Sequence, residues 1–183
     1  MLSGIRVVWR LPPTGTTGEV WPVADTVALR PLVVEDAVVM AAVLADPALY
    51  EFTGGEPPSV AELRTRYTIL TRGRSADGTE EWINMVVVLG HRQEPIGYVQ
   101  ATVPRDGDPA EIAWVIGRAW QGQGHATRAA QLLVDRLQQR GVRDLAAHIH
   151  PNHTASQAIA RTLGLSPTDA VVEGEVRWQR ISE

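Results

Sequence analysis

The sequence predicts a mixed α/β fold, with a mostly antiparallel mixed sheet of about six to seven strands flanked by about four helices. Three observations predict it. Apolar residues make up 44% of the 183-residue chain, which is enough for the core of one domain. Short β-branched runs alternate with turns that contain Gly and Asp, as in an antiparallel meander. Longer segments with helical spacing stand before and after that meander.

The first half of the chain predicts one strand, two helices and the meander. Glu35 and Asp36 fall in the first turn of the first helix, where negative charge is favourable. Ser59 and Glu62 have the spacing of a capping box at the start of the second helix. The expected elements are a strand over 26–32, helices over 34–45 and about 60–72, and strands over 81–89, 95–103 and 111–116.

The second half predicts two further helices, one strand and a final hairpin. Alanines and leucines recur at helical spacing in the first of these helices, so one of its faces packs on the sheet. Gly141 and Gly164 can provide left-handed caps, and Gly174 can provide the hairpin turn. The expected elements are a helix over 124–140, a strand over 145–150, a helix over 154–163, and strands over 170–173 and 175–178.

The element order is therefore β-α-α-β-β-β-α-β-α-β-β, in a single domain over residues 26–183 that follows an N-terminal extension over residues 1–25.

The amino-acid composition narrows the class of protein. The absence of cysteine excludes disulfides, a Cys-based zinc site and a cysteine nucleophile, and it fits a cytoplasmic location. We see no signal peptide and no apolar stretch long enough to span a membrane. A net charge of −4 disfavours nucleic acid as a partner and mildly favours a cationic one, such as an amine.

The turn before the 124–140 helix carries the clearest functional signal. Gly122 and Gly124 lack a Cβ, so their backbone N–H groups can approach a ligand closely. They stand at a helix N-terminus, which favours an anion, and Arg118 and Arg128 add positive charge. The turn therefore predicts a site for a phosphate or pyrophosphate. A P-loop would need Gly-Lys-Ser/Thr, and a Rossmann motif would need Gly or Ala where Thr127 stands.

The segment QGQGHA, residues 121–126, resembles the acetyl-CoA loop of the GNAT superfamily of N-acetyltransferases, Gln/Arg-x-x-Gly-x-Gly/Ala. The longer form WQGQGHAT is most similar to the RimJ/RimL-like branch, and the element order resembles the GNAT order over about residues 26–183. The resemblance implies a GNAT fold, acetyl-CoA as co-substrate and no metal. The cofactor-binding residues expected from it are Trp114, Val115, Ile116, Gln121, Gly122, Gln123, Gly124, His125, Ala126, Thr127, Asn152, His153 and Ser156.

A second segment, HPNHTAS at residues 150–156 followed by Leu-Gly-Leu, resembles the GNAT segment after the fifth strand. His153 stands where the family usually has an Asn that contacts the pantetheine arm, and Asn152 is one residue early; both side chains can hydrogen-bond an amide. Ala160 replaces the Tyr that acts as general acid in many members. Ser156 stands where RimJ/RimL-like members carry a Ser at the CoA sulfur, although a first-turn Ser can equally bond its own backbone.

Acetyl transfer to an amine needs a base, because an alkylammonium with a pKa of about 10 is protonated at neutral pH. Counting along the family pattern gives His148 as one candidate, and Glu111 at the start of the fourth strand is the other. Backbone N–H groups around Val115 and Ile116 could stabilise the oxyanion. The catalytic candidates are thus His148, Glu111 and Ser156, with a purely structural role as the alternative for each.

The acceptor expected from this resemblance is a protein N-terminus or a small polyamine or aminoglycoside-like molecule, so antibiotic resistance is one compatible role. It would enter beside the 46–59 loop and the C-terminal hairpin. A homodimer is compatible with the sequence, and a membrane partner is not expected.

Three alternatives stay open. The spacing of His148, His150 and His153 is compatible with zinc. The missing Tyr and displaced Asn allow a non-catalytic acyl-CoA-binding or regulatory module. A nucleotide-binding regulatory domain would need the lysine or third glycine that the turn lacks.

Overall fold

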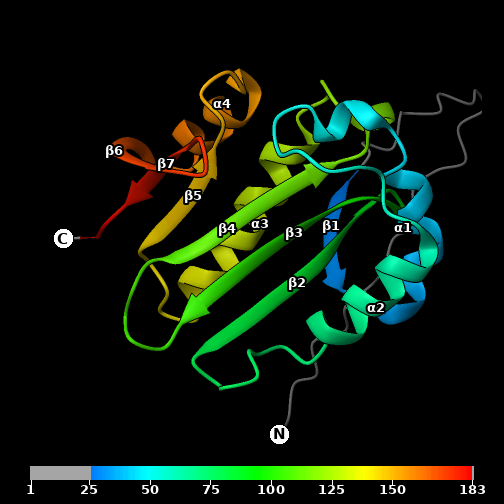
Figure 1. Ribbon diagram of the computed structural model, residues 1–183, viewed down its shortest axis with the longest axis horizontal. Helices are drawn as coiled ribbons and strands as arrows, with labels where there is room; N and C mark the ends of the chain where they lie inside the picture. The colour runs from blue at the N-terminus through cyan, green and yellow to red at the C-terminus, as the bar shows by residue number, and fades with distance from the viewer. Residues whose placement is uncertain (1–25, 183) are drawn as a thin grey trace, which may run out of the picture.

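The structure is a computed structural model that describes residues 26–182, so the expected N-terminal extension lies outside the described residues. The order of helices and strands predicted from the sequence is confirmed (Figure 1). Three short 3₁₀ turns occupy Val34–Asp36, Pro47–Tyr50 and Arg118–Trp120. The main elements are β1 (Val27–Pro31), α1 (Ala37–Val43), α2 (Val60–Leu70), β2 (Glu80–Leu89), β3 (Glu94–Pro104), β4 (Ala110–Ile116), α3 (His125–Gln139), β5 (Leu145–Ile149), α4 (Thr154–Thr162), β6 (Ser166–Val172) and β7 (Glu175–Arg180).

One sheet of seven strands, in the order β1-β2-β3-β4-β5-β7-β6, runs through the described residues. Every neighbouring pair is antiparallel except β4 and β5, which are parallel. The mixed, mostly antiparallel sheet expected from the sequence is thereby confirmed. The parallel pairing is limited to Ala110 with Leu145 and Glu111 with Ala146. Beyond these first residues β4 and β5 diverge, as Figure 1 shows.

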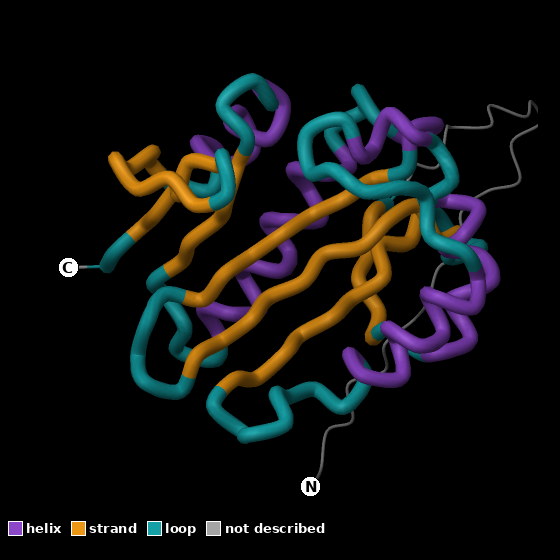
Figure 2. Tube along the Cα trace, in the orientation of Figure 1, coloured by secondary structure: helices purple, strands orange, loops and turns teal. Residues whose placement is uncertain are grey.

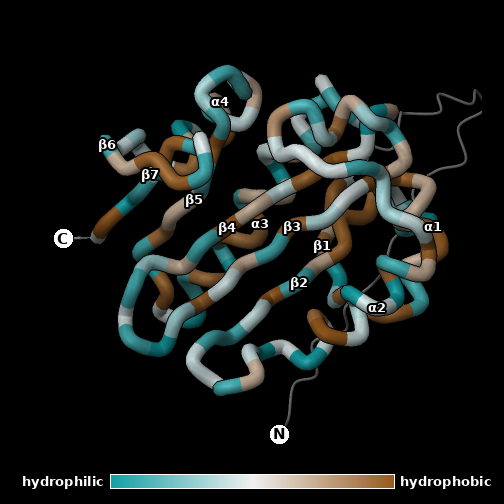
Figure 3. The backbone as a smooth tube through the Cα atoms, in the orientation of Figure 1, coloured by the Kyte–Doolittle hydropathy of each residue, from teal (hydrophilic) through white to brown (hydrophobic). Residues whose placement is uncertain are grey.

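Helices cover both faces of the sheet (Figure 2). The helices α3 and α4 share one core cluster with the sheet, and α1 and α2 share a second cluster on the opposite face. The buried stripe of α3 follows the helical spacing that the sequence predicts, and it includes Ala129, Leu133 and Leu137. In Figure 3 hydrophobic colour runs along β1 and much of β2, and hydrophilic colour marks the turn between β3 and β4.

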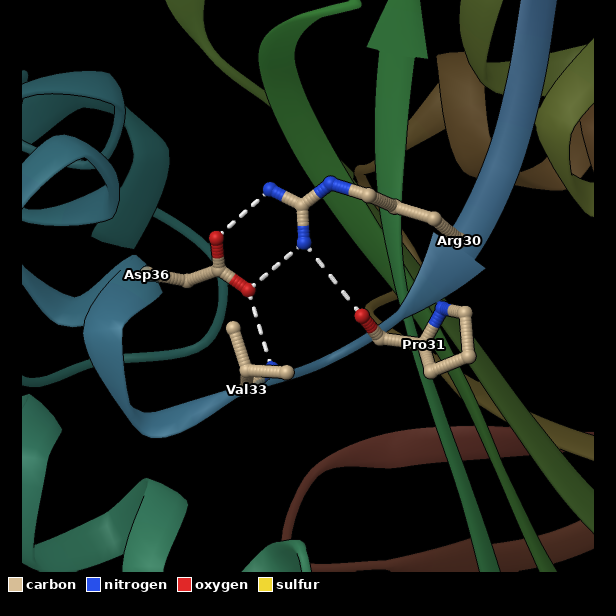
Figure 4. Close-up of polar contacts among 4 residues, drawn as sticks. All are labelled: Arg30, Pro31, Val33 and Asp36. Atoms are coloured by element: carbon tan, nitrogen blue, oxygen red, sulfur yellow. Dashed lines mark hydrogen bonds and ion pairs between the residues drawn. The ribbon is translucent and has the colours of Figure 1, made fainter.

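An ion pair fastens the edge strand β1 to the start of the α1 region (Figure 4). Both guanidinium ends of Arg30 bond the carboxylate of Asp36, at 2.8 and 2.6 Å. The N–H of Val33 also donates to Asp36. Burial raises the pKa of this carboxyl, but the bonds from Arg30 and Val33 outweigh burial and leave the pKa below its usual value. The sequence suggested only a favourable interaction of Asp36 with the helix dipole. In the structure Asp36 also bonds Arg30 of β1 and the N–H of Val33.

Glycine is required where β3 crosses the end of β4. Gly97 pairs with Ile116, and a Cβ at Gly97 would overlap the carbonyl oxygen of Val115. Any larger residue would push β4 away from β3 at the end of β4, several residues beyond the point where β4 leaves β5. The shape of β4 beside the gap therefore depends on a residue that belongs to the neighbouring strand.

Candidate functional site

The edge of β4 that faces β5 presents backbone N–H groups to the gap between the two strands. Successive residues in an antiparallel ladder direct their N–H and C=O groups to opposite sides. The N–H of Ala110 bonds the carbonyl oxygen of Asp144, on the β5 side, at 2.9 Å. The continuous register of β4 puts Trp114 and Ile116 on that same side. Since β4 and β5 pair only at their first residues, these two N–H groups face the gap.

A side-chain contact supports this assignment of sides. The carbonyl oxygen of Ile116 accepts a bond of 2.9 Å from Nε2 of Gln121, and so it points away from β3. Val115 lies between Trp114 and Ile116, and its N–H group therefore faces β3. The sequence suggested Val115 and Ile116 as N–H donors; the register instead favours Trp114 and Ile116.

The turn between β4 and α3 is open above both of its glycines. Gly122 and Gly124 have φ angles of 75° and 79°, the left-handed region that favours glycine. A Cβ built on either residue would have no atom within 4 Å. Gly124 is the N-cap of α3, and no side chain caps the helix there. The first N–H groups of α3 are therefore available to an anion.

Positive charge is held beside this turn. The guanidinium of Arg118 donates to Oε1 of Gln121 at 3.2 Å, while the other end of the Gln121 amide holds the end of β4. The side chain of Gln121 is thus occupied within the protein, and its backbone N–H donates to the carbonyl oxygen of Arg118 at 3.3 Å. Arg128 is exposed on the first turn of α3. Two arginines therefore flank the open helix N-terminus.

His125 differs from the other residues of the turn. Its side chain lies on the buried side of α3 and is only 9% exposed. The Nε2 atom is buried and has no hydrogen-bond partner among the described residues. Its backbone N–H, in the first turn of α3, is what His125 can offer to a ligand. Gln123 is exposed, and Ala126 and Thr127 are half-buried on the same first turn.

A hydrogen bond crosses the gap between β4 and α4. The indole Nε1 of Trp114 donates to Oγ of Ser156 at 3.3 Å. Because an indole N–H can only donate, Ser156 must accept, and its own hydroxyl proton remains available. Ser156 donates no side-chain hydrogen bond to another described residue. The contact between these two predicted site residues, 42 positions apart, could not be read from the sequence.

His153 closes the N-terminus of α4. Its Nδ1 accepts a bond of 3.4 Å from the N–H of Ser156, so the proton of the neutral ring is on Nε2. Burial is the largest cause that lowers the pKa of His153, followed by the neighbouring His150. Phe52, from the loop before α2, stacks on His153 with 4.6 Å between ring centroids. Asn152 is exposed, and its backbone N–H donates to Nδ1 of His150.

The two candidate bases lie together on the face of the sheet opposite α3. Nδ1 of His148 is 4.0 Å from Oε1 of Glu111. The Nε2 atom of His148 is buried and has no hydrogen-bond partner within residues 26–182. An unpaired buried ring nitrogen is unfavourable, and a bound substrate or water could satisfy it. The structure therefore brings together two residues that the sequence proposed separately.

A third residue at this position was missed in the sequence. Arg177 pairs with His148 across β5 and β7, and its NH1 atom donates to Oε1 of Glu111 at 3.3 Å. The signal available in the sequence was the alternation of polar residues in β7 around the buried Trp178. The pairing of β7 with β5, which places Arg177 beside Glu111, has no local sequence signal.

The zinc interpretation finds no support in the geometry. No group of three His, Cys, Asp or Glu residues within 26–182 is arranged to hold a metal ion, and the three histidines of the HxHxxH pattern do not form one. In the same part of the chain, no helix is both long and apolar enough to cross a membrane.

Comparisons with known proteins agree with this architecture. A family model described as an acetyltransferase (GNAT) domain matches residues 26–166. A RimL ribosomal L7/L12 alpha-N-protein acetyltransferase in complex with coenzyme A is 20% identical, with a TM-score of 0.71 over 87% of this chain and 96% of that chain. An acetyltransferase from Thermus thermophilus is 23% identical, with a TM-score of 0.67 over 85% and 96% of the two chains.

A third solved structure comes from a different kind of acetyltransferase. AAC(6')-Ib in complex with paromomycin and acetyl-CoA is 20% identical, with a TM-score of 0.69 over 85% of this chain and 92% of that chain. At these identities the likenesses show a shared fold. A search of curated protein sequences gives no match. Because the family model covers most of the sequence, the chain belongs to the GNAT acetyltransferase family.

Proposed function

We propose that this protein transfers an acetyl group from acetyl-CoA to a primary amine, directly and within a ternary complex. The observation that carries the proposal is the gap between β4 and β5, which opens beside the uncapped N-terminus of α3. The unpaired edge of β4 would bind an extended thiol arm, and the helix N-terminus would bind its phosphates. Residues 26–183 would form a single acetyltransferase domain, and we expect it to act in the cytoplasm because the chain has no cysteine.

The proposed acetyl-CoA site divides into two parts. The pyrophosphate would bind the backbone of residues 121–127, next to Arg118 and Arg128. The pantetheine arm would lie between the diverging strands and pair with β4, as an added strand would. Trp114 and Ile116 would supply the N–H groups, and Asn152 or Nε2 of His153 could contact an amide of the arm.

In the proposed reaction, Glu111 or His148 removes a proton from the acceptor ammonium, either directly or through water. The amine nitrogen then attacks the thioester carbonyl, and the oxyanion that forms is stabilised by N–H groups of β4. When the intermediate collapses, the C–S bond breaks, the nitrogen loses its extra proton to water, and a neutral amide remains on the acceptor. The hydroxyl of Ser156 would donate to the departing thiolate, in the orientation that the Trp114 bond leaves to it.

The acceptor would enter on the sheet face that carries Glu111 and His148, between the 46–59 loop and the β6–β7 hairpin. The similarity of WQGQGHAT to the RimJ/RimL-like branch favours a protein N-terminus, and the likeness to RimL is compatible with it. The likeness to AAC(6')-Ib is equally compatible with a small amine. A homodimer would not alter this scheme, in which all named groups come from one chain.

The experiment that tests the proposal measures thiol release from acetyl-CoA with a panel of amines, beside calorimetric binding of acetyl-CoA. The panel contains polyamines, aminoglycosides and peptides with free N-termini. We expect binding of acetyl-CoA and thiol release with one class of amine. Binding without turnover on any amine would favour the non-catalytic module, and absence of binding would overturn the assignment of the glycine turn.

A further inference from the structure

A small cavity lies under α2, on the same face of the sheet as Glu111. Its volume is about 40 Å³. Since one water needs roughly 10–15 Å³ of such space, a group of two or three heavy atoms fits. Leu63, Tyr67 and Arg66 line it from α2, and Tyr98 and Gln100 line it from β3.

Arg66, which is exposed on α2, brings a positive charge to the edge of this cavity, and its charge also helps to lower the pKa of Glu62, one turn earlier on the same helix. Arg66 makes no hydrogen bond and no ion pair with any described residue. The nearest acid along α2, Glu62, bonds Ser59 in the capping box. The side chains of Tyr98 and Gln100 likewise make no hydrogen bond within residues 26–182. The cavity therefore has a largely apolar lining, to which Arg66 adds a cation and Tyr98 and Gln100 add polar groups with unused hydrogen-bonding capacity.

The tyrosines indicate that Arg66 lies close to the cavity. Burial is the main cause that raises the pKa of Tyr67 to about 12, and burial also raises the pKa of Tyr50 and Tyr98. The charge of Arg66 acts in the opposite direction on the pKa of all three phenols. Of these three tyrosines, Tyr67 and Tyr98 line the cavity together with Arg66, whereas Tyr50 does not.

The strand register places Gln100, which lines the cavity, close to the candidate base Glu111. Gln100 pairs with Ala113, two residues along β4 from Glu111, and the three side chains share one face of the sheet. With strands about 4.8 Å apart and a rise of about 3.4 Å per residue, the Cα atoms of Gln100 and Glu111 are roughly 8 Å apart. An acceptor amine at Glu111 could thus extend a short chain to Arg66.

We propose that this cavity binds a carboxylate carried by the acceptor, so that the preferred acceptors are amines with a negative group a few bonds away from the reacting nitrogen. This inference rests on the proposed acetyltransferase function. It selects between the acceptor classes that remained open, because a polycation would bring a second ammonium next to Arg66. The local charge at the cavity thus opposes the preference for polycations that the net charge of −4 suggested.

The test compares three acceptors of similar length: 5-aminopentanoate, pentylamine and 1,5-diaminopentane. A peptide series with C-terminal amides, beginning Ala-Glu, Ala-Gln and Ala-Lys, offers the same choice on a protein-like acceptor. We expect kcat/KM to be roughly 10–100-fold higher for the carboxylate member than for its neutral partner, as for a hydrogen-bonded charge pair. A preference confined to the first series would identify small amino acids as acceptors, and one confined to the peptides would identify acidic N-termini.

Two variants on one helix make the test specific. Arg66→Gln should remove the preference for the carboxylate and leave turnover of pentylamine unchanged. Arg64→Gln is the matched control, because Arg64 is exposed on α2 like Arg66 but does not line the cavity. Equal rates for charged and neutral acceptors, or a preference that survives in Arg66→Gln, would overturn this inference while acetyl transfer stands. Failure to acetylate any amine would instead overturn the proposed function, and this inference with it.

Discussion

The gap between the diverging strands has two unlike walls, each a strand, a turn and a helix. In the β4–α3 unit the turn contains two glycines and the helix begins without a side-chain cap. The groups that can bind a ligand there are therefore backbone N–H groups. In the β5–α4 unit the helix is capped by His153, and side chains provide the polar groups. Trp114 and Ser156 make a hydrogen bond between the two units.

This difference suggests that one unit binds the co-substrate and the other takes part in proton transfer. Backbone N–H groups at an open helix N-terminus suit the binding of phosphates, and a negative side chain among them would oppose that binding. Side chains can hold or move protons, which the backbone cannot do. Substitutions in the β4–α3 turn should therefore change the affinity for acetyl-CoA, and substitutions around the β5–α4 unit should change turnover.

The largest effect is expected at the pair of candidate bases, where the two units meet. Glu111→Gln and His148→Gln should each be tested, and the variant that removes the general base should lower kcat by about 10²–10⁴-fold. Calorimetry should show unchanged binding of acetyl-CoA. Glu94→Gln, an exposed carboxylate at the start of β3, serves as control. If neither variant loses activity, the face that carries Glu111 does not hold the base.

The second effect tests the other wall. In Gly124→Asp a carboxylate enters the open space at the start of α3 and repels the pyrophosphate. At an effective dielectric constant of about 20, like charges about 5 Å apart repel by roughly 3 kcal/mol, or about 100-fold in the dissociation constant of acetyl-CoA.

Gly124→Asn is the matched neutral variant, because Asn has nearly the same shape and also tolerates a positive φ. Titration calorimetry on both variants separates the charge from the backbone effect. Similar affinities for the two variants would show that no phosphate binds at this turn.

A smaller effect tests the contact between the walls. Trp114→Phe removes the indole donor and keeps an aromatic ring, so Ser156 loses the bond that orients its hydroxyl. A bond of this kind contributes about 1 kcal/mol, which predicts a decrease of about fivefold in kcat. In Ser156→Ala the same substitution at Trp114 should have no further effect on kcat. Additive losses in the double variant would contradict the idea that Trp114 acts through Ser156.

The smallest effect concerns stability at the capped helix. The unfolded chain takes up a proton on His153 with the ordinary pKa of about 6.5, whereas burial lowers the pKa of His153 in the folded protein. His153 therefore contributes stability that is complete above about pH 6.5 and is lost as the pH falls through the lowered folded pKa.

His153→Asn keeps a side chain that can cap α4 and removes the titrating group. Urea denaturation at pH 7.5 and 5.5 should show a smaller loss of stability on acidification for this variant than for the wild type. The difference in slope cannot exceed about 1.4 kcal/mol per pH unit, the limit for one proton. Equal slopes would mean that His153 does not titrate differently in the folded protein.

Much of the fold could be predicted because its signals are local. The period-two runs of the meander, the Ser59 capping box and the spacing in α3 each lie within one element, and each is confirmed. The hairpin strand β6 begins at Ser166, earlier than the sequence predicts. Its first residues were missed because they are largely exposed and show no hydrophobic alternation.

The site was harder to predict because it depends on contacts between distant segments. The glycine turn could be found from six adjacent residues. The bond from Trp114 to Ser156 and the position of Arg177 beside Glu111 depend on how strands pair and where a helix packs. The sequence also could not assign the N–H donors of β4, since one bond at Ala110 and the register decide which residues face β5.

The order of strands in the sheet has a consequence for synthesis on the ribosome. From β1 to β5 the strands are added to the sheet in the order in which they are translated. Domains generally fold as their residues emerge, so the meander with α3 could assemble before β5 has left the exit tunnel. The nascent chain would then complete first the β4–α3 unit, which we propose to bind the phosphates of acetyl-CoA, and the β5–α4 unit with its histidines would be added afterwards.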